Sequence, residues 1–181
     1  MKFAATTIVW ILMLASCREI SFPEAQPSGV KALNKVPSEL VGRYLSYDKK
    51  SGDESDTLII ETWGYHFMDK EGKEWLNRGT LSDTLVLKWY KGYYFVNFKV
   101  EDQWILRLIK QKPSGAVEFM SIDINDDEKR KEILKKISKK LEIKEIDING
   151  DLFYQIRPTP SQLMELINEG FFTGDTLDKL R

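Results

Sequence analysis

Two residue types that could carry out nucleophilic or acid–base chemistry occur only once each in this sequence: the thiol of Cys17 and the imidazole of His66. A Ser-His-Asp or Cys-His mechanism needs the histidine as its base. His66 lies among aromatic residues in the run 64–68, and the chain has no G-x-S-x-G motif. We therefore predict that His66 packs or faces solvent, and we assign no catalytic residue.

Metal ligation has little support from the residue types. Zinc requires three or four histidine, cysteine or carboxylate ligands, and this chain has one histidine and one cysteine. Residues 123–127 and 147–151 alternate oxygen-bearing side chains as a calcium loop does, but both stretches lack the later glycine and glutamate of an EF-hand. A helix cap and a hairpin turn explain the same residues, so we expect no metal and no cofactor.

The surroundings of Cys17 give its sulfur a different role. Lys2 is followed by an uncharged, mostly apolar run over residues 3–16. That run is shorter than the roughly 20 residues of a spanning helix, so it predicts a cleaved export signal. The end of the run, Leu14-Ala15-Ser16-Cys17, resembles the lipobox of bacterial lipoproteins.

This resemblance implies a diacylglycerol thioether on Cys17, removal of residues 1–16 and acylation of the new amino terminus. The mature protein would be held at a membrane of the bacterial cell envelope by its lipid. Arg18 stands where enteric bacteria use aspartate for inner-membrane retention, so the resemblance favours the outer membrane. It covers residues 1–17 alone.

Composition divides the remainder into two parts. Residues 17–37 contain three prolines and no hydrophobic period, which predicts a flexible tether behind the lipid. Residues 38–181 form the expected single domain. Because 27 basic and 28 acidic residues nearly balance, we expect no nucleic-acid partner. Basic residues gather between 129 and 140, which we interpret as a solvated helix face, with attraction to an anionic partner as the alternative.

Short stretches of alternating apolar residues, separated by turn signals, predict strands through the first half of the domain. They cover residues 41–47, 57–61, 65–69, 75–81, 84–90, 93–100, 104–110 and 116–123. A helix capped near residue 125, a hairpin at Asn149-Gly150 and a helix from Thr159-Pro160 to Gly170 should follow. The predicted fold class is α+β and predominantly antiparallel β: an eight-stranded meander forming a barrel or sandwich, then helix, hairpin and C-terminal helix.

The strand series, with Gly42-Arg43-Tyr44 near its start, is similar to small lipocalin-like lipoproteins. The chain departs from that family at Tyr44, where a Gly-x-Trp motif would place tryptophan, and in its extra hairpin and second helix. No ligand residue is carried over from the family.

An aromatic cluster, Trp89, Tyr90, Tyr93 and Tyr94, is the candidate surface for a ligand or a partner. The expected function is non-enzymatic binding of a protein or small ligand at the envelope. The alternatives are an envelope hydrolase with paired carboxylates and an immunity-type protein against a secreted toxin.

Overall fold

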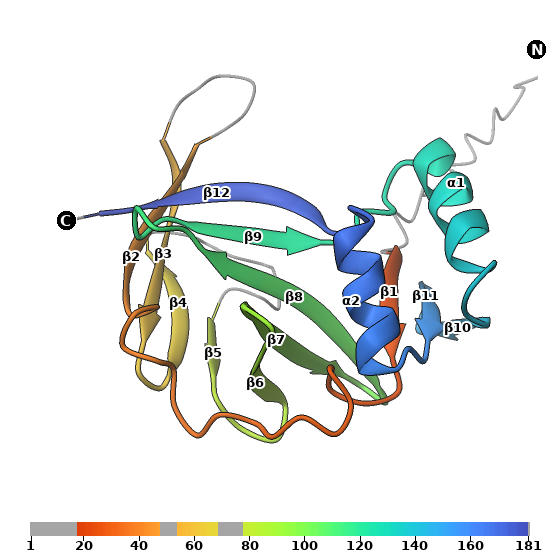
Figure 1. Ribbon diagram of the computed structural model, residues 1–181, viewed down its shortest axis with the longest axis horizontal. Coiled ribbons are helices and arrows are strands. Elements are labelled where there is room, and N and C mark those ends of the chain that lie inside the picture. The colour runs from red at the N-terminus through yellow and green to blue at the C-terminus, as the bar shows by residue number, and fades with distance from the viewer. Residues whose placement is uncertain (1–17, 48–53, 69–77, 181) are drawn as a thin grey trace, which may run out of the picture.

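The structure is a computed structural model that describes residues 18–47, 54–68 and 78–180 (Figure 1). These residues form an α+β fold that is mostly antiparallel β, with two helices, α1 (Asp127–Ile137) and α2 (Pro160–Asn168). The strands are β1 (Arg18–Phe22), β2 (Gly42–Tyr47), β3 (Glu54–Glu61), β4 (Gly64–Met68), β5 (Arg78–Thr80), β6 (Leu85–Tyr90), β7 (Tyr93–Val100), β8 (Gln103–Gln111), β9 (Val117–Ser121), β10 (Ile143–Ile148), β11 (Asp151–Ile156) and β12 (Thr173–Lys179).

The strands belong to one branched sheet. Two meanders, β2 to β5 and β6 to β9, are joined by β12, which pairs with β9 on one side and β2 on the other. Strand β8 pairs with β7 along one edge, while β1 and then β9 share its other edge. Beyond β1 lie β11, which is parallel to it, and β10. Among the described residues β5 and β6 do not pair, so the sheet is open there.

Two cores lie on opposite faces of this sheet, as the alternation along β8 shows. Leu106 and Leu108 belong to the helix-side core, which both helices cover, whereas Ile105 and Ile109 belong to the inner core. The rings of Tyr65 on β4 and Phe98 on β7 have their centroids 6.1 Å apart. Because β4 and β7 are distant along the strand order, the sheet must curl around the inner core.

The predicted flexible tether is wrong for the residues that the structure describes. Arg18–Phe22 form β1 between β8 and β11, and Phe22 is almost fully buried. The following loop is bonded to the sheet: Leu33 N–H donates to the Leu87 carbonyl at 2.8 Å, and Val36 N–H donates to Thr62 at 2.9 Å. The prolines limit regular secondary structure in this segment, but its residues still pair with the sheet. The folded domain therefore begins at Arg18 rather than at residue 38.

The strand count and the end of the fold also differ from prediction. The described residues include nine strands before α1, because β1 lies in the expected tether. The chain continues beyond the predicted C-terminal helix into β12, whose sequence offers one buried apolar residue, Leu177. A strand with so weak a period gives little sequence signal, and its place between β9 and β2 interrupts the expected simple meander.

Candidate functional site

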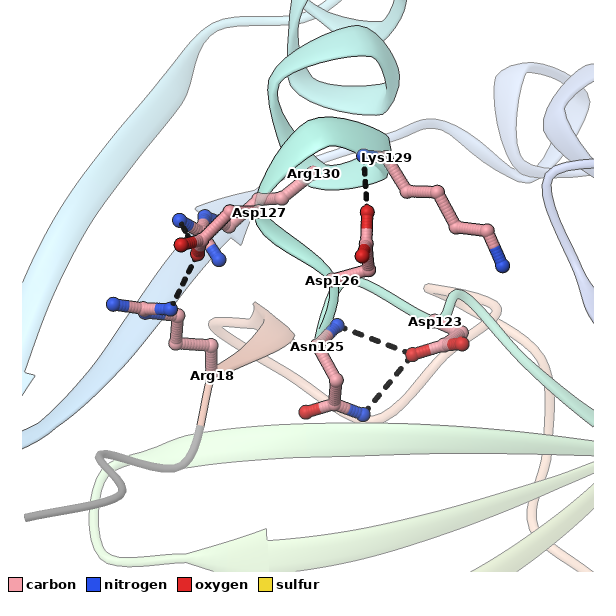
Figure 2. A network of polar contacts seen from close by, with 7 residues as sticks. All are labelled: Arg18, Asp123, Asn125, Asp126, Asp127, Lys129 and Arg130. Atoms are coloured by element: carbon pink, nitrogen blue, oxygen red, sulfur yellow. Dashed lines mark hydrogen bonds and ion pairs between the residues drawn. The ribbon is translucent and has the colours of Figure 1, made fainter.

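Cys17 lies outside the described residues, but the chain that follows it is placed beside α1 (Figure 2). Arg18 Nη1 donates to Asp127 Oδ1 at 2.9 Å, and Arg130 Nη2 donates to the same oxygen at 2.5 Å. Hydrogen bonding and charge from Arg130, with a smaller contribution from Arg18, lower the pKa of Asp127. The first described residue is therefore joined to the start of a helix.

The acidic stretches that resemble parts of a calcium loop serve as caps and turns. Asp126 Oδ1 accepts the backbone N–H of Lys129 at 2.8 Å and caps α1, one residue later than the predicted start (Figure 2). Asp123 Oδ1 accepts two bonds from Asn125, and Asp147 Oδ1 accepts the N–H of Gly150 at 3.2 Å. Within the described ranges no group of three or more potential ligands is arranged to hold a metal ion.

His66 lies on β4, where its backbone pairs with β3 and β5. Its ring is parallel to that of Trp63, with the centroids 6.0 Å apart. The Nδ1 atom is buried without a hydrogen-bond partner. The imidazole of His66 thus stacks on the ring of Trp63.

The four aromatic residues of the candidate surface lie at the β6–β7 hairpin, but they do not form one exposed patch. Trp89 is opposite Tyr94, and Tyr90 is opposite Tyr93. Trp89 is 52% exposed, whereas Tyr94 is 6% exposed and donates its hydroxyl to Glu39 Oε1 at 2.7 Å. Tyr90 and Tyr93 pack against the helix-side core. A binding role for this hairpin stays a prediction that now centres on Trp89.

The inner core contains a cavity of about 290 Å³ that sequence reasoning missed. Its walls come from the loop before β2 and from strands of both meanders, together with β12. The described residues lining it are Val36, Leu40, Leu58, Ile60, Gly64, Tyr65, Phe67, Leu81, Leu85, Leu87, Val96, Phe98, Ile109, Phe119, Asp175 and Leu177. The alternation of apolar residues was visible in the sequence, but the space between the strands depends on how the sheet curls.

Two of these lining residues carry polar side chains. The hydroxyl of Tyr65 is buried without a hydrogen-bond partner, which typically costs about 1–3 kcal/mol, and burial raises the pKa of Tyr65 to about 12. Asp175 is exposed on β12, so its carboxylate lies at the edge of the cavity. The space between them is enclosed by hydrocarbon and aromatic rings, which suits an apolar molecule.

A second, open groove follows α1 and the end of α2. Lys129, Lys136, Lys139 and Lys140 line it together with Glu132 and Glu169. Lys136 is paired with Glu132 at 2.6 Å, and Lys140 is paired with Glu169. Two of the four lysines that line this groove are therefore paired with a neighbouring carboxylate.

No family model, curated protein or solved structure matches this chain. Neither helix of the described part is both long and apolar enough to cross a bilayer. The features of this chain that bear on its function are therefore the cavity and the residues around Cys17.

Proposed function

We propose that this protein is a lipid-anchored binding protein of the bacterial cell envelope, which holds a small apolar ligand in the cavity of its inner core. The observation that carries the binding proposal is the cavity itself, since sites for small molecules are concave and mostly apolar, with few polar groups. Its volume of about 290 Å³ is close to the lower end of the usual range of roughly 300–1,000 Å³.

In this proposal the curled sheet acts as a half-open barrel that encloses a ligand, as in the lipocalin-like lipoproteins that the strand series resembles. The lipid on Cys17 and the outer-membrane location are part of the same proposal and are supported by the lipobox residues 14–17. A protein partner at Trp89, a hydrolase and an immunity-type role stay predictions, and the cavity favours the small-ligand form of binding over them.

Binding is tested with the mature chain, residues 17–181, carrying Cys17→Ser so that it needs no detergent. This chain contains all twelve strands and both helices of the described residues, and cooperative unfolding is checked first. The probe is 1-naphthylamine, whose fluorescence changes when it leaves water. We expect saturable binding that Val96→Phe weakens at least tenfold, because Val96 lines the cavity.

The matched control is Val86→Phe on the neighbouring strand β6, which adds the same atoms at a residue that does not line the cavity. We expect this variant to bind the probe as the parent does. Absence of saturable binding by the folded chain, or equal effects of the two substitutions, would contradict the proposal.

The anchor is tested separately by expressing the full chain in bacteria. We expect it to partition into the detergent phase and to have the mass of an acylated chain that begins at Cys17. Cys17→Ser should move the protein to the aqueous phase. An unmodified thiol on a chain that retains residues 1–16 would exclude the anchor without affecting the cavity.

A further inference from the structure

The chemistry of the cavity limits the charge of its ligand. Among the described residues that line it there is no lysine, arginine or histidine. The Tyr65 hydroxyl is buried in the wall, and the one carboxylic acid among these residues is Asp175. An ionised carboxylate or phosphate would lose its hydration on entry, and none of the described lining residues offers it a cation in return. We therefore expect the part of the ligand inside the cavity to be uncharged.

The volume limits the size of the ligand. An engineered apolar cavity of about 150 Å³ is known to hold one benzene molecule. The cavity described here is about 290 Å³, which is roughly twice as large. By this proportion it holds about ten to twelve carbon atoms, the size of a bicyclic aromatic or a medium-length alkyl chain.

We propose that the cavity selects an uncharged apolar molecule of about ten to twelve carbon atoms, and that it discriminates against anionic amphiphiles and longer chains. This inference depends on the proposed ligand-binding function and names its ligand class. The walls offer both aromatic and aliphatic contacts: the ring centroids of Phe67 and Phe98 lie 6.2 and 6.1 Å from that of Tyr65, and the other apolar lining residues are mostly aliphatic.

The charge limit is tested by displacing 1-naphthylamine from the Cys17→Ser chain with decanol and with decanoate at neutral pH. The two molecules have the same number of carbon atoms, but decanol ends in an uncharged hydroxyl group and decanoate in a charged carboxylate. We expect decanol to bind at least tenfold more tightly than decanoate. If the two bind equally, the inference is overturned while the binding function stands.

The size limit is tested with straight-chain alcohols of six to fourteen carbons. Each methylene that enters the cavity should improve affinity about fourfold, and we expect this gain to stop near ten to twelve carbons. An unbroken gain up to fourteen carbons would overturn the size limit. If the parent chain does not bind 1-naphthylamine at all, the proposed function itself fails.

A matched pair of leucines links the size limit to the cavity. Leu87 lines it and Leu106 lies in the helix-side core, and both are 3% exposed. We expect Leu87→Ala to enlarge the cavity and to move the break in the alcohol series to longer chains. Leu106→Ala should lower stability but leave the break unchanged. A break that stays in place in Leu87→Ala would place the binding site elsewhere.

Discussion

Asn97 on β7 is fully buried, and its amide group attaches the first loop of the domain to the sheet. Its Oδ1 accepts the N–H of Gln26 at 2.6 Å, and its Nδ2 donates to the Gln26 carbonyl at 2.8 Å. Lys88 donates nearby to the carbonyls of Ala25 and Pro27, and burial lowers the pKa of its ammonium group. At the residue scale, buried polar side chains thus hold a segment that lacks regular structure.

Replacing Asn97 by leucine would keep the number and branching of the side-chain heavy atoms and would leave both polar groups of the Gln26 backbone without their partner. Each unpaired buried group costs about 1–3 kcal/mol, so we expect Asn97→Leu to lower the free energy of unfolding by about 2–4 kcal/mol. Urea unfolding measures this value. The exposed Asn34 is the control, and Asn34→Leu should change stability by less than about 0.5 kcal/mol. Equal stability of Asn97→Leu and the parent would refute the role of this amide.

The tyrosines next to the inner core predict a response to alkali. Burial raises the pKa of both Tyr65 and Tyr94 to about 12, and for Tyr94 the nearby Glu39 adds to the effect. Tyrosines in the unfolded chain ionise near pH 10, so the free energy of unfolding is unaffected by these two groups below pH 10 and falls as the pH rises toward 12. Absorbance at 295 nm should show a step near pH 12 that shrinks in Tyr65→Phe. An unchanged high-pH step in that variant would contradict the assignment.

At the scale of the elements, α2 shows how local residue choice determines both ends of a helix. Thr159 Oγ1 accepts the N–H of Gln162, whose side chain accepts the N–H of Thr159 in return. At the other end Gly170 has φ of 79°, and the N–H of Phe171 donates to the Leu166 carbonyl at 3.1 Å. These are the cap and the ending that the sequence predicts.

Removing the cap should destabilise the domain by a small, defined amount. We expect Thr159→Ala to lower the free energy of unfolding by about 1 kcal/mol, since the helix loses one accepted hydrogen bond at its first turn. Thr173→Ala, at an exposed threonine outside any helix, is the matched control and should change stability by less than about 0.5 kcal/mol. Thermal or urea unfolding compares the two. Equal losses would argue against the cap as the cause.

Elements with strong local signals could be predicted from the sequence, whereas those defined by distant partners could not. The hairpin at Asn149 and Gly150 has the positive φ angles that its residues allow, 57° and 92°. By contrast, β1 depends on pairing with β8 and β11, which are far along the chain. β12 has a weak apolar period, so its own residues give little sign of a strand, and it is held as one by pairing with β9 and β2.

The candidate site, too, combines features that the local sequence predicts with features that depend on distant parts of the chain. Apart from β12, each strand that lines the cavity was predicted in part from its own alternation, but the cavity exists only where the two meanders curve toward each other. The sequence of one strand carries no information about that curvature. The aromatic residues of the β6–β7 hairpin are visible in the sequence, but the structure divides them between the two faces of the sheet.

At the scale of the whole molecule, both ends of the described chain lie inside the sheet. β1 has β8 and β11 as neighbours, and β12 has β9 and β2. Figure 1 shows β12 running along β9 and reaching β2 at the far end. The two terminal strands therefore join parts of the sheet that would otherwise be separate.

Ending the chain at Phe172 removes β12 and should abolish cooperative folding, because β9 and β2 would lose their shared neighbour and Leu177 would leave the inner core. Near-ultraviolet circular dichroism and thermal unfolding measure this loss. Removal of Arg181 alone keeps β12 and should leave the transition unchanged. A cooperative transition in the chain that ends at Phe172 would show that the two meanders are stable without β12.

The position of β12 has a consequence for biogenesis if the export signal acts as proposed. A polypeptide emerging from a secretion channel amino end first would deliver this strand last, so the gap beside β9 would stay open until synthesis and transit were complete. The domain would therefore complete its folding only after β12 had reached the far side of the membrane and paired with β9 and β2.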